Sequence, residues 1–246
     1  AFNFFVGKKN KNPTLGLTLV DTLYNLGPAF VKLGQGLATR PDIIGTSLAN
    51  ELAILQDNME PFSSISAKKI IFEETGKDPS ELFEEFNDKP IAAASIAQVH
   101  KGKTFDGRYI AIKLLRPGIE KAISKDINFF IWCATLISQF EPNMSNLRLI
   151  KAVEIFRQIT MDEMDFRLEA AAASELRENF KDDHRFEVPI IFWPLTSQRM
   201  LVLEWVDGIK INDKEALISG GHNIAEITTN ASEAFFLQVF RDGFFH

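Results

Sequence analysis

The stretch IAAASIAQVHKGKTFDGRYIAIKLLRPG, residues 91–118, decides the fold. Polar and apolar residues alternate from Ser95 to Thr104, and a second alternating run follows from Tyr109 to Leu115, which indicates two half-buried strands. Asp106-Gly107 between the runs is typical of a tight hairpin turn. Arg116-Pro117-Gly118 ends the second run. The sequence therefore predicts an antiparallel β-hairpin whose entrance is lined by small residues.

The residues before this hairpin predict helices. Leucines spaced three or four apart draw one stripe from Thr14 to Leu26, and Gly27-Pro28 ends that helix and opens a second one that runs to about Thr39. Apolar spacing predicts two more helices, one around Leu48–Leu55 and one over 67–75. We therefore expect residues 1–88 to form an N-terminal helical extension.

The residues after the hairpin predict one more sheet segment between helices. Helices are expected over 119–140, as one long helix over 147–180, and near the end over 214–219 and 223–240. Val188–Trp193 and Met200–Trp205 are rich in β-branched and aromatic residues and predict a second hairpin. This order is typical of an α+β fold, a protein-kinase-like small lobe with an antiparallel sheet over 89–206, followed by the start of a large lobe over 207–246.

Composition excludes several classes of protein. The 27 Lys and Arg against 33 Asp and Glu give a net charge of −6, whereas a general nucleic-acid binder concentrates positive charge. The uncharged run from Ile127 to Phe140 is too short to span a bilayer, which needs about 20 apolar residues. A single cysteine, Cys133, excludes an intramolecular disulfide. No metal site is predicted from the widely separated histidines, His100, His184, His222 and His246.

Two features of the first hairpin point to a nucleotide. Small side chains at Ala92, Ala93, Ala94 and Ser95 let backbone N–H groups approach phosphate oxygens, although alanine makes a stiffer loop than glycine. Lys113 ends an Ala-Ile-Lys sequence on the second strand, where an ammonium can steady phosphates. The alternatives are an alanine-rich segment chosen for tight packing and an exposed lysine on an edge strand. The return of the second strand beneath the small-residue segment favours the nucleotide site.

Acidic residues on the predicted long helix could hold such a lysine. Glu169 precedes four alanines that allow close approach of another element, and Asp165 lies one turn before it. Two like charges at this spacing repel unless a cation lies near them, and we expect that cation to be Lys113. Glu163 and Arg167 lie four apart and could form an ordinary surface ion pair.

In the helical extension, Lys32 and Gln35 share a helical face. By themselves they are typical of a solvated surface, and Gly34 between them lowers helix propensity.

Taken in order, these motifs resemble the UbiB family of atypical protein-kinase-like proteins. The resemblance rests on Lys32-Leu33-Gly34-Gln35, Ala92-Ala93-Ala94-Ser95, Ala111-Ile112-Lys113, Glu163-Met164-Asp165 and the hinge-like segment 201–211, and it covers nearly the whole chain. It implies a nucleotide-dependent ATPase or kinase that uses ATP and Mg²⁺ and supports ubiquinone biosynthesis at a membrane.

The resemblance also implies roles for individual residues. Lys32 and Gln35 would form a gate over the active site, with Glu163 and Asp165 contacting it. Ala92 to Ser95 would be the nucleotide loop. Lys113 would hold phosphates with Glu169 as its ion-pair partner, and the hinge facing adenine would run from Glu204 to Val206.

The chain departs from the family pattern at its end. No His-Arg-Asp-like loop with a downstream Asn occurs, and Asp242-Gly243-Phe244 is not an Asp-Phe-Gly metal motif. We therefore expect the Mg²⁺ ligands to lie beyond His246, the large lobe to be truncated, and this chain to be inactive as an ATPase. Two alternatives stay open: a nucleotide- or lipid-binding pseudokinase-like module without catalysis, and a helical structural domain in which the motifs are coincidental.

The resemblance also implies partners and a location. Expected partners are nucleotide, quinone precursors or other lipids, other ubiquinone-biosynthesis proteins and a membrane surface, but no nucleic acid. The location would be the cytoplasmic face of a bacterial inner membrane, or a mitochondrion in a eukaryote, with this piece itself soluble. The basic residues Lys8, Lys9 and Lys11 could contact anionic lipid, although a solvated N-terminus is the simpler interpretation.

Overall fold

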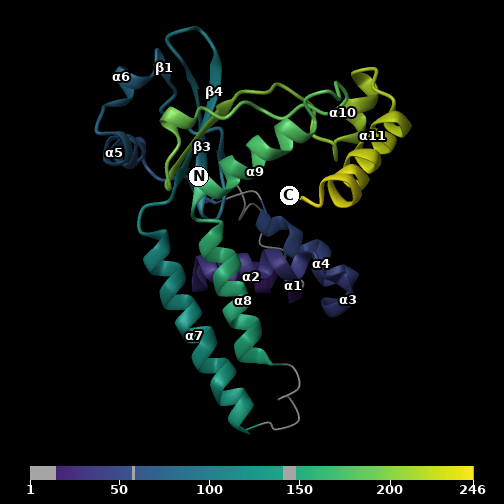
Figure 1. The fold of residues 1–246 in the computed structure, drawn as a ribbon. Coiled ribbons are helices and arrows are strands. Elements are labelled where there is room, and N and C mark those ends of the chain that lie inside the picture. Colours follow the sequence, from purple (N-terminus) through teal and green to yellow (C-terminus); the bar gives the residue numbers. More distant parts are fainter. Residues whose placement is uncertain (1–14, 57–58, 141–147, 246) are drawn as a thin grey trace. The chain divides into compact units, whose positions relative to one another are not determined.

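A computed structural model describes residues 15–56, 59–140 and 148–245 (Figure 1). The chain divides into two compact units, each assembled from three stretches of sequence. The helical unit comprises Ala1–Ala67, Lys89–Val99 and Leu114–Met164, and the sheet unit comprises Lys68–Asp88, His100–Lys113 and Asp165–His246. The basic residues near the N-terminus and His246 lie outside the described residues.

The helices predicted on either side of Gly27-Pro28 are present. Helices α1 (Leu15–Leu26), α2 (Pro28–Ala38) and α4 (Thr46–Leu52) pack against one another, with a short α3 (Pro41–Ile44) and a 3₁₀ turn (Ala53–Gln56) completing the chain path. Their shared core is apolar and almost fully buried, and consists of Val20, Leu23, Val31, Leu52 and Leu55. Burial of this stripe, rather than intrinsic helix propensity, stabilises helices as short as these.

Helices α7 (Ile119–Phe140) and α8 (Leu149–Asp162) lie side by side in the same unit (Figure 1). Helix α2 packs on α7, where the ring of Phe30 meets Phe130 edge-on at 4.6 Å. The Ala29 N–H donates to the Asp126 carboxylate at 3.3 Å, so α7 supplies an N-terminal cap for α2. Burial raises the pKa of Asp126. Gly27 adopts φ 140° here, and a Cβ at that position would lie 2.5 Å from Asp126 Oδ2.

The five-stranded sheet has the order β1-β3-β4-β5, with β2 also paired to β3. Its strands are β1 (Glu85–Phe86), β2 (Ala92–Ala93), β3 (Ala97–Lys103), β4 (Tyr109–Leu115) and β5 (Met200–Glu204). Strands β1 and β2 both run antiparallel to β3. The β3–β4 hairpin is the predicted one, and Gly107 takes the positive φ of 87° that its turn requires. The mixed helical and antiparallel architecture confirms the predicted α+β class.

Two helices come directly before strand β1 in the sequence. Helix α5 runs from Ser64 to Thr75, close to the predicted range, and α6 spans Pro79–Leu82. Arg199, just before β5, ties α5 to the strand by donating to Glu74 at 2.6 Å and Glu73 at 2.9 Å.

The predicted long helix over 147–180 is wrong in one respect, because it is two helices. Helix α8 ends at Asp162 and α9 runs from Phe166 to Asn179. Asp165 between them has extended backbone angles, and its carboxylate accepts the Arg167 N–H at 3.1 Å as the N-cap of α9. An aspartate that caps a new helix competes with continuation of the old one, so the chain breaks without Gly or Pro.

The predicted second hairpin forms only in part. Strand β5 is present, but residues 188–193 contribute a single bridge, Ile191 to Leu203. Two backbone bonds flank it, from the Phe192 N–H to the Val202 carbonyl and from the Glu204 N–H to the Ile190 carbonyl, both at 2.8 Å. Pro189 and Pro194 lack the N–H groups that a longer ladder needs, and Trp193–Leu195 forms a 3₁₀ turn.

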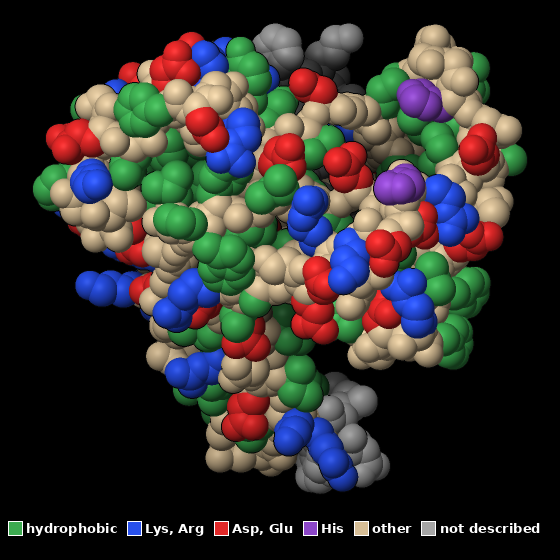
Figure 2. Space-filling model, turned by 45° about the horizontal axis from the view of Figure 1, so that its top comes forward, with side chains coloured by type: hydrophobic (Ala, Val, Ile, Leu, Met, Phe, Trp, Pro, Cys, Tyr) green, Lys and Arg blue, Asp and Glu red, His purple; other side chains and the backbone are tan. Residues whose placement is uncertain are grey.

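The last helices follow prediction more closely. Helix α10 spans Lys214–Ser219 as expected, while α11 covers Ile224–Phe236 and gives way to a π-helical segment at Leu237–Asp242. Across the described ranges, no helix combines the length and hydrophobicity needed to cross a membrane. Acidic and basic side chains are interspersed over the face drawn in Figure 2.

Candidate nucleotide site

Lys113 and Glu169 form an ion pair inside the sheet unit. Strand β4 places the lysine and the first turn of α9 places the glutamate, so that Lys113 Nζ lies 2.7 Å and 2.9 Å from the two carboxylate oxygens. The same ammonium lies 4.8 Å from the centre of the Phe166 ring. Side-chain exposure is 27% for the lysine and 39% for the glutamate. The ammonium is therefore held in one place yet remains open to a ligand.

Asp165 does not share that ammonium as we expected. Its carboxylate instead accepts from Arg167 Nη2 at 2.6 Å and from Nε at 2.8 Å. The Arg167 guanidinium and the capped N–H lower the pKa of Asp165. The alternative surface pair between Glu163 and Arg167 is absent among the described ion pairs, in which Glu163 pairs with Lys32 and Arg167 with Asp165. Lys113 thus has one carboxylate partner, because the helix break turns Asp165 to a capping role.

Lys32 and Glu163 form a second ion pair, inside the helical unit. Lys32 lies on α2, and Glu163 directly follows α8. The lysine side chain is only 10% exposed, whereas the glutamate side chain is 45% exposed. Of the two acidic residues expected to contact the gate motif, Glu163 does so.

Gln35 connects α2 to the alanine-rich segment. Its Nε2 donates to the Leu55 carbonyl at 2.8 Å, and its Oε1 accepts from Ser95 Oγ at 3.4 Å. Gly34 beside it is buried. A Cβ at this position would lie 2.5 Å from Leu55 Cδ1 and 2.7 Å from Leu23 Cδ1, so only glycine fits without a shift of these leucines. Close packing of α2 on these two leucines therefore accounts for a glycine at this position, although glycine lowers helix propensity.

The segment Ala92 to Ser95, called the alanine loop from here on, is tied down on several sides. Ala92 and Ala93 form β2, and the Ala94 N–H closes a tight turn on the Ala97 carbonyl at 2.7 Å. The Met59 N–H donates to the Ala93 carbonyl at 3.1 Å, and Arg116 Nε donates to the Ala94 carbonyl at 2.9 Å. The sequence assigned Arg116 only to the end of a strand, so this contact was missed.

The hinge-like residues follow β5. Glu204 exchanges bonds with Ile190, which donates to Glu204 Oε2 at 3.2 Å and accepts from the Glu204 N–H at 2.8 Å. The Trp205 N–H donates to the Tyr109 carbonyl at 3.0 Å, and Val206 is 59% exposed. The segment is therefore anchored at its start and open at its end.

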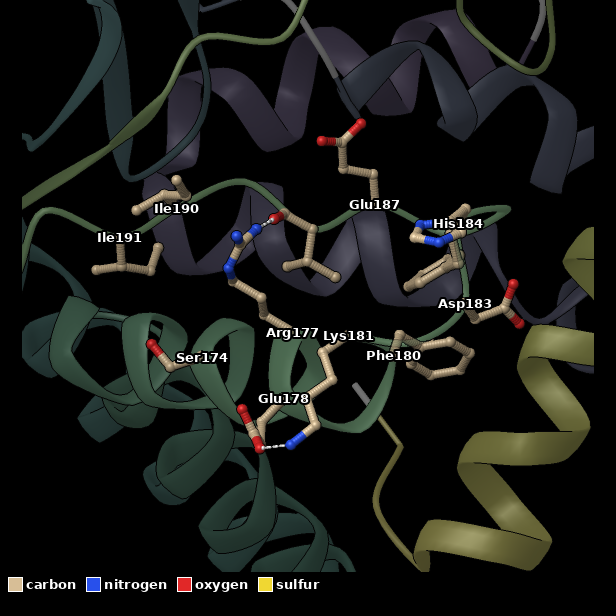
Figure 3. A pocket seen from close by; sticks show the side chains of 12 residues that line it. Ser174, Arg177, Glu178, Phe180, Lys181, Asp183, His184, Glu187, Ile190 and Ile191 are labelled. Atoms are coloured by element: carbon tan, nitrogen blue, oxygen red, sulfur yellow. Dashed lines mark hydrogen bonds and ion pairs between the residues drawn. The ribbon is translucent and has the colours of Figure 1, made fainter.

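A cavity of about 550 Å³ lies elsewhere in the sheet unit, between the C-terminal half of α9 and residues 180–191 (Figure 3). None of the candidate site residues lines it, although Ile190, the hydrogen-bond partner of Glu204, does. Its basic groups are already engaged, since Arg177 donates to the Val188 carbonyl at 2.8 Å and Lys181 pairs with Glu178 (Figure 3). We assign it no ligand.

No group of three or more metal-ligating side chains occurs in the described ranges. Glu163, Asp165 and Glu169 are each engaged by a lysine or an arginine, so they do not form a ready Mg²⁺ site. The residues present therefore suit the phosphates of a nucleotide, through the Lys113 ammonium, better than they suit the metal ion.

Comparison with known proteins finds relatives of most of the chain. Residues 54–246 match the ABC1 atypical kinase-like domain. Proteins named "Probable protein kinase UbiB" from Aeromonas salmonicida and Marinobacter nauticus are 39% identical over 244 residues and 41% identical over 224 residues. The alignments cover 99% and 91% of this chain but 45% and 41% of those relatives, so the chain spans less than half their length.

A solved structure shares the fold. The structure titled "The complex structure of Rv3197-erythromycin", from Mycobacterium tuberculosis, superposes with a TM-score of 0.55 at 27% sequence identity. The match covers 76% of this chain and 46% of that one. The match to the domain extends over more than half of the sequence, and the chain therefore belongs to the ABC1 atypical kinase-like domain family.

Proposed function

We propose that this chain is the nucleotide-binding part of an atypical kinase or ATPase that supports ubiquinone biosynthesis. The observation that carries the proposal is the two-oxygen ion pair of Lys113 with Glu169, at 2.7 and 2.9 Å. In kinases, a lysine on the third strand steadies the α- and β-phosphates and is itself held by a glutamate from the packed helix. An ammonium held on β4 and partly open to solvent suits that role.

The other assignments extend this proposal. The alanine loop would contribute backbone donors to phosphate, and residues 204–206 would face adenine. Lys32 and Gln35 would act as a gate, which is supported by the Lys32–Glu163 ion pair and the Gln35–Ser95 hydrogen bond. Bound Mg²⁺ would neutralise phosphate charge, and its ligands would come from residues other than those described. Membrane and ubiquinone-pathway partners rest on likeness to the relatives alone.

The test is a nucleotide titration followed by thermal unfolding. A ligand that binds only the folded state stabilises it, by about 2.7 kcal/mol at a hundred times the dissociation constant. For a chain of this length that corresponds to an increase in Tm of roughly 5–10 °C. We expect ATP to raise the Tm of the wild type and of Lys103→Ala, but not that of Lys113→Ala.

Lys103→Ala is the matched control for this titration. Lys103 also lies on the sheet and pairs with a carboxylate, Glu84 at 2.9 Å, but it is not the nominated phosphate lysine. Glu169→Gln should weaken the ATP response without removing it, because the ammonium remains while its restraint is lost. An equal Tm increase in Lys113→Ala and in the wild type would refute the proposed site.

A further inference from the structure

Arg116 bonds to backbone carbonyls, whereas a surface arginine usually pairs with a carboxylate or with water. It follows β4 in the sequence Leu115-Arg116-Pro117, and no carboxylate of the described chain lies within ion-pair distance of it. Its guanidinium instead donates to two backbone carbonyls, that of Ala94 at 2.9 Å and that of Glu60 at 2.8 Å. The guanidinium carbon, Cζ, lies 5.9 Å from the centre of the Phe62 ring. Burial without a counter-charge lowers the pKa of Arg116.

These bonds join two segments that are far apart in sequence. Glu60 follows Met59, whose N–H donates to the Ala93 carbonyl at 3.1 Å. The Arg116 N–H also donates to the Ile96 carbonyl at 2.8 Å. Arg116 and the 59–60 backbone therefore hold the carbonyls of residues 93, 94 and 96, which leaves the alanine loop little freedom to turn its peptides.

A fixed carbonyl also fixes the N–H that follows it. The peptide unit is planar and trans, so the Ala94 carbonyl and the Ser95 N–H point in opposite directions. While Arg116 holds the carbonyl, the Ser95 N–H must point away from the guanidinium. Neither the Ser95 N–H nor the Ile96 N–H donates to any residue within the described ranges. Both residues are less than a tenth exposed, and buried N–H groups without a partner are rare in folded proteins.

We infer that Arg116 is a positioning residue for the alanine loop, orienting the Ser95 N–H, which is followed by the Ile96 N–H, as a donor to an anionic oxygen. This rests on the proposed function in one respect, since the anion we nominate is a nucleotide phosphate. Successive N–H groups in a turn form a concave anion site. Glycine-rich loops gain their fit by flexibility, whereas here a guanidinium behind the backbone fixes the same groups in advance.

The test compares three variants by hydrogen exchange and by ATP affinity. Arg116→Ala removes both carbonyl contacts, and Arg116→Lys keeps the charge but lacks the two separate nitrogens, Nε and Nη2, that reach the two carbonyls. Arg108→Ala is the control, because Arg108 lies on the same hairpin and pairs with Asp106. In the wild type, ATP should slow exchange of the Ser95 and Ile96 amides.

Arg116→Ala should speed exchange over residues 93–97 by about fivefold or more, because the restrained peptides open locally. It should weaken ATP binding about tenfold, the effect of losing a charge-assisted hydrogen bond. Arg116→Lys should resemble Arg116→Ala in both measurements, and Arg108→Ala should resemble the wild type. Full affinity in Arg116→Lys, or unchanged exchange in Arg116→Ala, would overturn the inference.

Two further outcomes are separable. If the wild type binds no ATP, the proposed function fails, while the exchange rates of the unliganded variants still decide whether Arg116 fixes the loop. If Arg116→Ala does not fold, Arg116→Lys decides alone, and wild-type exchange rates together with wild-type affinity in that variant would exclude the positioning role.

Discussion

Two glycines on one helix should respond in opposite ways to the same substitution. Gly34 and Gly36 both lie within α2, and neither has a positive φ. Replacing a helical glycine with alanine stabilises a protein by roughly 0.8–1 kcal/mol when the new methyl group meets nothing. No atom lies within 4 Å of a Cβ built at Gly36. Gly36→Ala should therefore raise the free energy of unfolding by about 1 kcal/mol.

Gly34→Ala gains the same helix propensity but adds a methyl group to a packed core. The new Cβ would lie 2.5 Å from Leu55 Cδ1 and 2.7 Å from Leu23 Cδ1, and both leucines are buried. Relief of such overlap costs about 1–3 kcal/mol. Subtracting the propensity gain leaves a net loss of up to about 2 kcal/mol, so the two variants should differ by about 1–3 kcal/mol.

The assay is urea unfolding of the wild type and both variants, with thermal unfolding as a second measurement. For a chain of this size, 1 kcal/mol corresponds to roughly 2–4 °C in Tm, so the difference between variants is measurable. Equal stabilisation by Gly34→Ala and Gly36→Ala would refute the close packing of α2 on Leu23 and Leu55. It would also remove the packing reason for the glycine between Lys32 and Gln35.

Three other predictions concern the Lys32–Glu163 ion pair, the pH dependence of stability and ATP hydrolysis. A double-mutant cycle with Lys32→Met and Glu163→Gln should give a coupling free energy of about 1 kcal/mol, since the lysine is largely buried and the glutamate half-exposed. A coupling of zero would show that the ion pair does not stabilise the fold. Burial lowers the pKa of His100 below its ordinary 6.5, so the unfolded chain takes up this proton first and stability should fall as the pH drops below about 6.5. His100→Gln should reduce that dependence in urea unfolding at several pH values, and equal pH slopes in wild type and His100→Gln would contradict this. The chain should hydrolyse no ATP measurably in a phosphate-release assay, since it lacks a catalytic-loop aspartate, and turnover abolished by Lys113→Ala would show that expectation to be wrong.

Elements bounded by Gly and Pro could be predicted closely from sequence. The first hairpin, α7 and α10 have the expected limits, because turn residues end each of them and their apolar periods are regular. The break at Glu163–Asp165 could not be predicted, because the local sequence holds no breaker. An aspartate begins a helix only when its carboxylate accepts from an N–H two or three residues later. A regular apolar pattern that continues across the aspartate does not reveal whether it caps a new helix or lies within one helix.

The candidate site divides in the same way. Lys113 could be nominated from sequence because it ends an Ala-Ile-Lys sequence on an alternating strand, and Glu169 because it precedes four alanines on a helix. The structure brings the two side chains together. Arg116 could not, because its partners are backbone carbonyls, and every residue has one. The proposed roles of both groups in binding nucleotide stay predictions until the titrations above are made.

The cap on α2 limits how this chain can be dissected. The carboxylate that accepts the Ala29 N–H belongs to Asp126, 97 residues further along the chain. A peptide made from the N-terminal helices alone would lack that acceptor, so the first N–H groups of its second helix would have no side-chain partner from α7. Gly27, with its φ of 140°, lies outside the helical region and does not extend the helix. The segment carrying Lys32 and Gln35 is thus a poor choice for study as an isolated fragment. Any excised piece meant to preserve it should extend through α7.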